Sequence, residues 1–92
     1  MFADWLNGLR DRRAQARIDV RLRRLSLGNF GDTKSLGDGV SKLRIDYGPE
    51  YRLYYTRRGE QIVILLCGGD KKRQNARIAR AKEMVKEVDD AP

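Results

Sequence analysis

The sequence predicts an α+β fold in which helices at both ends of the chain flank a small antiparallel sheet. Apolar and charged residues alternate with a period of two between residues 40 and 56, which is typical of strands with one buried face. Before residue 27 and after residue 72, apolar residues recur every three or four positions, as in amphipathic helices. At 92 residues the chain is long enough for one domain, which covers residues 1–92.

Two helical patterns open the chain. The first is short and holds Phe2, Trp5, Leu6 and Leu9 at helical spacing. A second helix is predicted from Arg12 to Ser26, with Asp11 as its cap and Gly28 as its stop. Its apolar stripe consists of Ala14, Ile18, Leu22 and Leu25. The pattern leaves open whether the two form an antiparallel hairpin or one bent helix.

The rest of the second helix and its approach are rich in arginine. These residues are Arg10, Arg12, Arg13, Arg17, Arg21, Arg23 and Arg24. Such a cluster indicates contact with RNA phosphates, and a solvated helix face is the alternative. The pattern does not separate the two.

Three strands are predicted after a glycine-rich loop at residues 29–39. They run Val40–Tyr47, Tyr51–Thr56 and Gln61–Cys67, and a tight loop at residues 48–50 joins the first two. The third is apolar from residue 62 onward, which predicts a central strand covered on both faces, with Cys67 as a small core residue. Trp5 is likewise expected in the core.

Register follows from matching apolar with apolar residues across the first two strands. This pairs Tyr47 with Tyr51, Ile45 with Leu53, and Leu43 with Tyr55. The opposite face, which we expect to be open to solvent, then carries cations and a phenol, with Asp46 facing Arg52. These residues are Lys42, Arg44, Arg52 and Tyr54. Such a platform suits a phosphodiester, with Lys34 of the preceding loop close by, and a solvated face with an Asp46–Arg52 ion pair is the alternative.

A last helix is predicted from about Lys72 to Val88. Its packed stripe consists of Ile78, Ala81, Val85 and Val88. Its start carries Lys71, Lys72, Arg73, Arg77 and Arg80. Cations at a helix N-terminus oppose the helix dipole, so a bound polyanion would offset this cost.

The amino-acid composition favours one kind of partner and excludes several kinds of catalytic and metal site. The chain has 20 lysines and arginines against 13 acidic residues, a net charge of +7, which predicts an anionic partner. It has no histidine and one cysteine, so Ser-His-Asp catalysis, histidine metal sites and internal disulfides are excluded, and no cofactor or metal is expected. No apolar run approaches membrane-spanning length and no secretory signal is visible, so we expect a cytoplasmic protein.

Three motifs cover much of the chain. They are Gly31-Asp32-x-Lys34-x-x-Gly37-x-Gly39-Val40-x-x-Leu43-Arg44-Ile45, then Gly48-Pro49-x-Tyr51-Arg52-x-Tyr54-Tyr55, then Leu65-Leu66-x-Gly68-Gly69-Asp70-Lys71-Lys72-x-Gln74. Together they resemble the RelE/ParE toxin superfamily, and within it the HigB-like addiction module killer proteins. The resemblance implies a type II toxin with two N-terminal helices on a twisted antiparallel sheet, paired with a HigA-like helix-turn-helix antitoxin.

The resemblance also implies an activity. RelE and HigB types cut mRNA in the ribosomal A site and so inhibit translation, whereas ParE types inhibit DNA gyrase. Residue by residue, the catalytic positions of the family fall on Lys42, Arg44, Arg52, and Lys71 or Lys72. The residues expected to contact RNA are Lys34, Tyr54, Arg73 and Arg77.

The chain departs from the family pattern at three places. No aromatic residue follows Tyr55, so the C-terminal catalytic tyrosine has no counterpart, and Lys42 stands where the killer-protein branch has glutamate. The family fold opens with a strand that has no match before the first helix. We therefore expect three strands and an open sheet edge available to an acidic antitoxin segment.

The expected reaction is attack of the 2′-hydroxyl on the adjacent phosphorus, giving a 2′,3′-cyclic phosphate. Arg44 and Arg52 would clamp the phosphate, and Lys42, with a pKa lowered by like charges, would accept the proton. Lys71 or Lys72 would shield the leaving oxygen, and Tyr54 would stack on a base or donate a proton. A gyrase inhibitor and a non-catalytic RNA-binding module remain the alternatives.

Overall fold

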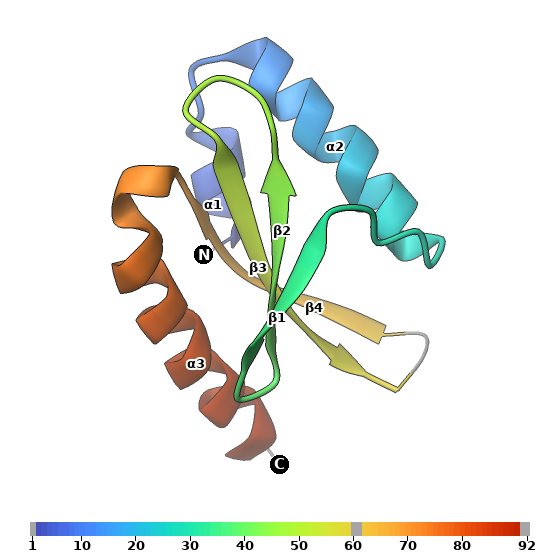
Figure 1. Ribbon diagram of the computed structural model, residues 1–92, viewed down its shortest axis with the longest axis vertical. Helices are drawn as coiled ribbons and strands as arrows, with labels where there is room; N and C mark the ends of the chain where they lie inside the picture. The colour runs from blue at the N-terminus through green and yellow to red at the C-terminus, as the bar shows by residue number, and fades with distance from the viewer. Residues whose placement is uncertain (1, 60–61, 91–92) are drawn as a thin grey trace.

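The computed structural model describes residues 2–59 and 62–90, and they form the predicted α+β fold. The elements are α1 (Phe2–Asn7), α2 (Arg12–Ser26), β1 (Thr33–Gly37), β2 (Val40–Ile45), β3 (Tyr51–Arg58), β4 (Ile62–Gly69), the 3-10 turn η1 (Lys71–Arg73) and α3 (Gln74–Asp90). The four strands make one antiparallel sheet in the order β1-β2-β3-β4. Figure 1 shows α2 and α3 on either side of this sheet. No helix within the described ranges is long and apolar enough to cross a membrane.

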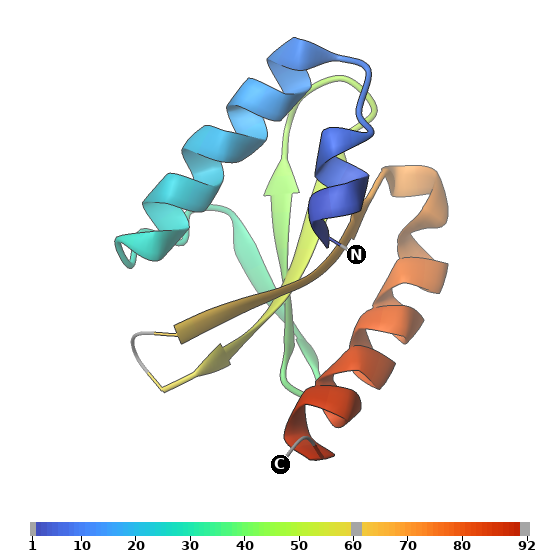
Figure 2. The ribbon, with the colours of Figure 1, turned by 180° about the vertical axis from the view of Figure 1, so that it is seen from behind.

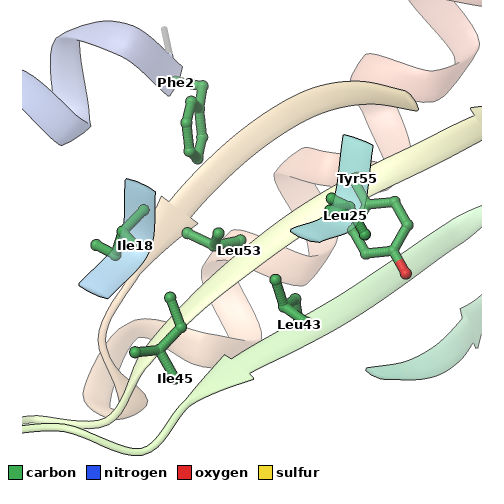
Figure 3. Close-up of a cluster of buried hydrophobic side chains, with 7 residues drawn as sticks. All are labelled: Phe2, Ile18, Leu25, Leu43, Ile45, Leu53 and Tyr55. Atoms are coloured by element: carbon green, nitrogen blue, oxygen red, sulfur yellow. The ribbon is translucent and has the colours of Figure 1, made fainter. Parts of the chain in front are cut away.

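The sheet has an apolar core on each face. The core under α1 and α2 contains Phe2, Ile18, Leu25, Leu43, Ile45, Leu53 and Tyr55, as Figure 3 shows. The core under α3 contains Val40, Tyr54, Leu66, Cys67, Ala81 and Val85. Because α3 covers part of the face that carries the cations, that face is less open than the strand pattern alone predicts.

The N-terminal segment forms two separate helices, which excludes the alternative of one bent helix. Asp11 caps α2 by accepting hydrogen bonds from the backbone N–H groups of Arg13 and Ala14 at 2.9 and 3.3 Å. The Gln15 side chain donates to the carbonyls of Leu6 and Leu9 at 2.9 and 3.0 Å, so it ties α2 to the end of α1. The predicted bounds of α2 are confirmed.

The expected number of strands was wrong, because part of the predicted loop is strand β1. It pairs with β2 through a turn at Gly37, Asp38 and Gly39, all with positive φ. Its side chains are mostly polar and exposed, so the segment lacks the alternation that marks a half-buried strand. The strand forms through backbone pairing, and Thr33 adds hydrogen bonds to the Lys42 carbonyl and the Tyr55 hydroxyl.

The predicted register of β2 and β3 was wrong by two residues. Leu43 pairs with Leu53 and Arg44 with Arg52, so the expected Asp46–Arg52 pairing does not form. The connection spans residues 46–50, which is longer than the tight loop expected, and Gly48 and Glu50 both have a φ of +57°. A shift of two preserves which face each side chain occupies, so the alternation could not distinguish the two registers.

The two glycines that end β4 allow a helix to approach each face. A Cβ on Gly68 would lie 2.4 Å from two ring carbons of Trp5 in α1. A Cβ on Gly69 would lie 3.0 Å from Cγ of Arg77 in α3. The strand runs Ile62–Gly69, two residues beyond its predicted end, and the expected first residue, Gln61, lies outside the described residues. It was expected to be a central strand, and this was wrong, because within the described residues β4 pairs only with β3, at the edge of the sheet, and Ile62 is exposed. Its apolar run reflects contact with the apolar cores on both faces of the sheet.

The predicted core residues are buried or partly buried, and Ile78 and Val88 of the α3 stripe belong to the second group. Cys67 is buried, and burial raises the pKa of its thiol. Trp5 is half-buried and packs against the rings of Phe2 and Tyr51. In α3 the Ala81 and Val85 side chains are buried, as its stripe predicts. The start of this helix was expected as continuous α-helix and is a 3-10 turn, whose backbone N–H at Arg73 bonds to the Asp70 carboxylate at 3.1 Å.

We predict that Gly68→Ala destabilises the fold by about 1–3 kcal/mol, because the added methyl forces Trp5 out of its place. Urea unfolding monitored by circular dichroism measures this. In a Trp5→Ala background the same change should cost far less, since the clash is gone. An equal loss of stability in both backgrounds would show that Gly68 is not required to make room for the Trp5 ring.

Candidate functional site

Four cations gather on the sheet face that α3 partly covers. We call Lys34, Lys42, Arg44 and Arg52 the cationic platform. Lys34 lies directly opposite Lys42, and Arg44 directly opposite Arg52. Like charges in such cross-strand pairs destabilise a sheet. A bound anion would remove this repulsion, so the arrangement favours an anionic ligand over a merely solvated face.

Arg44 is the accessible guanidinium of the platform. Its side chain is 46% exposed, and its Nε donates to the Asp32 carboxylate at 2.9 Å. The backbone N–H of Arg44 also bonds to the Asp32 carbonyl at 3.1 Å. This contact orients the guanidinium and leaves its two terminal nitrogens without a hydrogen bond to the described residues. Two parallel donors of this kind match two oxygens of a phosphate.

Arg52 was expected on the solvent face, and this was wrong. It is 6% exposed, because β3 is an interior strand whose face is covered by α3. One terminal nitrogen donates to the Glu50 carbonyl at 2.8 Å, and the other lies 4.0 Å from the Glu50 carboxylate. Its Nε is buried without a partner among the described residues. Replacing Arg52 would therefore disturb the fold as well as any ligand contact.

Tyr54 cannot stack on a base, so its predicted RNA contact was wrong. Its side chain is fully buried in the core beneath α3, opposite Lys42 on one strand and Cys67 on the other. Burial raises the pKa of its phenol to about 12, and the nearby Arg52 and Arg77 oppose the shift. The hydroxyl has no hydrogen-bond partner among the described residues. The alternation placed Tyr54 on the correct face but could not show that α3 lies above it.

Lys42 is half-buried in the middle of the platform. Its pKa is lowered, first by burial and then by the charges of Arg52, Lys34 and Arg44, while Asp32 opposes the shift. The predicted direction is confirmed, and the leading cause is burial rather than like charge. An amine with a lowered pKa is neutral more often near neutral pH, which is what a proton acceptor requires.

The basic residues of the 3-10 turn and of the first turn of α3 lie in different surroundings. Lys71 lies 3.5 Å from the Glu50 carboxylate, which links it to Arg52. Lys72 lines the same open cavity of about 680 Å³ as Lys71 and Glu50. Arg73 is exposed on the 3-10 turn, with no described contact to the platform. Arg77 lies over Gly69, the strand partner of Arg52.

Sequence reasoning missed two carboxylates that position the platform. Asp32 partners Arg44, and Glu50 partners both Arg52 and Lys71. Asp32 stands two residues before Lys34, so recognising β1 as a strand would have placed both on one face. Glu50 carries no such signal, because its position depends on a left-handed backbone at the end of the loop. Within residues 2–59 and 62–90, no three acidic or cysteine side chains form a group that could hold a metal.

Comparison with known proteins gives a match over most of the chain. Residues 4–87 match the family described as phage-derived protein Gp49-like (DUF891). The chain is similar to an uncharacterised protein of Haemophilus influenzae, with 48% identity over 87 residues that cover 95% of this chain and 88% of the relative. No solved structure matches the chain.

We predict that Lys42 titrates below the ordinary lysine value of 10.5, and that Arg44→Gln moves its pKa upward by removing a neighbouring positive charge. Lysine side-chain NMR across alkaline pH measures both, with Arg23→Gln on α2 as the control. The unfolded chain binds more protons between the two pKa values, so this group makes the free energy of unfolding rise with pH across that interval. An ordinary pKa, unmoved by Arg44→Gln, would show that the platform does not act on Lys42.

Proposed function

The chain belongs to the phage-derived Gp49-like family, a family of RelE/HigB-type toxins, and from that premise we propose that it is the toxin of a type II toxin–antitoxin pair that cuts mRNA on the ribosome. The observation that carries the nuclease assignment is the cationic platform, in which like charges face each other across adjacent strands. A gyrase inhibitor needs the same fold without this platform.

The proposed reaction uses the RNA's own nucleophile. The 2′ oxygen forms a bond to the adjacent phosphorus while the bond from phosphorus to the 5′ oxygen breaks. One product ends in a 2′,3′-cyclic phosphate and the other begins with a 5′-hydroxyl. The protein must take the 2′ proton, stabilise the negative oxygens on phosphorus, and help the leaving oxygen gain a proton.

Arg44 and Arg52 divide the work of holding the phosphate. Arg44 is half-exposed and oriented by Asp32, so its free nitrogens make the direct contact. Arg52 is buried and held by Glu50, so it adds positive potential from beneath. Because it is already fixed in the folded protein, this charge needs no rearrangement during the reaction.

Lys42 is the proposed proton acceptor, and Lys71 is the proposed group that stabilises the leaving oxygen. Lys42 is next to both arginines, and its lowered pKa makes it the acceptor of the 2′ proton. Lys71 is exposed and lies beside Glu50, at the edge of the open cavity near the start of α3. From there it shields the developing charge on the 5′ oxygen, with Lys72 lining the same cavity.

The surroundings of the platform support dependence on the ribosome. The cavity beside it is open and lined by loop residues, so the protein alone offers little to fix the sugar and phosphate geometry. A ribosome that holds the mRNA in the A site would supply that orientation, which is worth many orders of magnitude in rate. A HigA-like helix-turn-helix antitoxin is the proposed partner that restrains the toxin.

We predict that expression in cells produces mRNA 5′ ends within translated messages only, as mapped by primer extension. Arg44→Ala should reduce cutting by a factor of about a hundred or more, since one transition-state phosphate contact is lost. The fold should survive, because the exposed Arg44–Asp32 pair contributes only about 0–1 kcal/mol. Arg23→Ala removes an equal charge from exposed α2 and should cut normally. Intact mRNA together with DNA damage would select the gyrase inhibitor instead.

Lys42→Arg separates an enzyme from an RNA-binding module. Arginine keeps the charge but does not lose its proton near neutral pH, so ribosome binding should persist while cleavage falls by about 10²–10⁴-fold. Ribosome affinity and single-turnover mRNA cleavage, measured across pH for both proteins, provide the comparison. Equal cleavage would assign Lys42 to electrostatics alone, and the base would then be another group.

A further inference from the structure

A second basic surface lies on the side of the sheet opposite the cationic platform. Helix α2 packs on the face away from α3, as Figures 1 and 2 show from the two sides. A groove of about 700 Å³ runs along α2, and Ile45 and Asp46 at the end of β2 line its other side. We call it the α2 groove, and the residues that matter for its chemistry are Arg13, Ala16, Arg17, Val20, Arg21 and Arg24.

The four arginines form one row along the groove. They recur at steps of four, four and three residues, so they span roughly 16 Å of one helix face. None forms an ion pair with a described carboxylate, and Asp46 is the one acidic residue in the lining. The four arginines together with Asp46 give the groove a net charge of about +3, spread along one face of the helix.

Two of these arginines are held in place in the free protein. The Arg17 guanidinium lies 4.6 Å from the centre of the Tyr47 ring. Arg21 donates from Nη1 to the Arg44 carbonyl at 3.3 Å, and its other terminal nitrogen is buried without a partner in the described part of the chain. Charges that are already fixed lose little conformational entropy on binding. Arg17 can contact a ligand directly, whereas Arg21, with one terminal nitrogen bonded and the other buried, adds positive potential.

The floor of the groove is apolar, and this decides what kind of anion fits. Val20 is 47% exposed in the middle of the row, and Ala16 lies one helical turn before it. Phosphates gain nothing from an exposed valine, because their contacts are made by charge and hydrogen bonds. A helix with one apolar and one acidic face gains from both the floor and the arginine row.

We propose that the α2 groove binds an acidic amphipathic helix of a protein partner. Carboxylates on one face of that helix pair with Arg13, Arg17 and Arg24, and a small apolar residue between them packs on Val20. The partner docks on the sheet face opposite to Arg44 and Arg52, so its binding and RNA cleavage involve different residues. The proposal does not require the protein to be a nuclease.

The test uses a designed peptide as the probe. It is an 18-residue, fluorescein-labelled helix of alanine, leucine and glutamate, with its glutamates on one face at steps of four, four and three. A scrambled peptide of the same composition is its control. Fluorescence anisotropy measures binding of both peptides, and of a 15-residue oligouridylate RNA, at low and moderate salt. The patterned peptide should bind more tightly than the scrambled one, and salt should weaken it.

Matched variants locate the binding surface. Arg13→Ala/Arg24→Ala removes two groove arginines, and Arg12→Ala/Arg23→Ala removes two exposed arginines of the same helix outside the groove. The groove variant should weaken peptide binding by about tenfold or more, and the control by less than about threefold. All four side chains are exposed, so both proteins should fold, which circular dichroism verifies.

Val20→Lys distinguishes the peptide from RNA. The added charge should leave RNA binding unchanged or tighter, whereas loss of the apolar contact should weaken the peptide by about three- to tenfold. Equal losses from the two arginine pairs would overturn the proposal, because net charge alone would then explain binding. It would also be overturned if Val20→Lys tightened both ligands, or if only RNA depended on the groove arginines.

Discussion

Strand β3 is buried on both faces, and most of the structure follows from this constraint. Every residue from Arg52 to Thr56 is buried, because α1 and α2 cover one face of the sheet and α3 the other. An arginine in such a strand needs protein groups around its charge, and the carbonyl and carboxylate of Glu50 provide them for its two terminal nitrogens, while its Nε has no partner among the described residues. The same packing excludes side chains from the end of β4, where Gly68 and Gly69 admit Trp5 and Arg77.

As a result, the residues of the cationic platform are buried to different degrees. Arg52 is enclosed, Lys42 is half-buried and Arg44 is half-exposed, so the three residues cannot share one role. The outer guanidinium can touch a ligand, the middle amine has a lowered pKa, and the inner charge adds potential from a fixed position. The like-charge pairs cost stability in the free protein, and an anion bound across them would recover that free energy.

The two basic surfaces differ in what surrounds their cations. The platform lies on paired strands, with Asp32 and Glu50 beside its arginines. The α2 groove has arginines on a helix around the exposed Val20, with one acidic residue in its lining. Charge alone would give both surfaces the same partners. The apolar floor is the feature that separates a phosphate-binding platform from a surface suited to an amphipathic helix.

Local patterns in the sequence determined the bounds of α2 and the buried stripes of both long helices. They also determined which face of the sheet each residue of β2 and β3 occupies. Periods of 3.6 and two residues depend only on neighbouring residues, so a local pattern is sufficient for these features. They also located the cations of the platform. The tertiary structure decided the rest. A two-residue shift of register keeps every side chain on its face, strand β1 exists through pairing with β2, and Arg52 and Tyr54 are buried only because α3 returns across the sheet. These outcomes depend on contacts between distant segments, which no local pattern records.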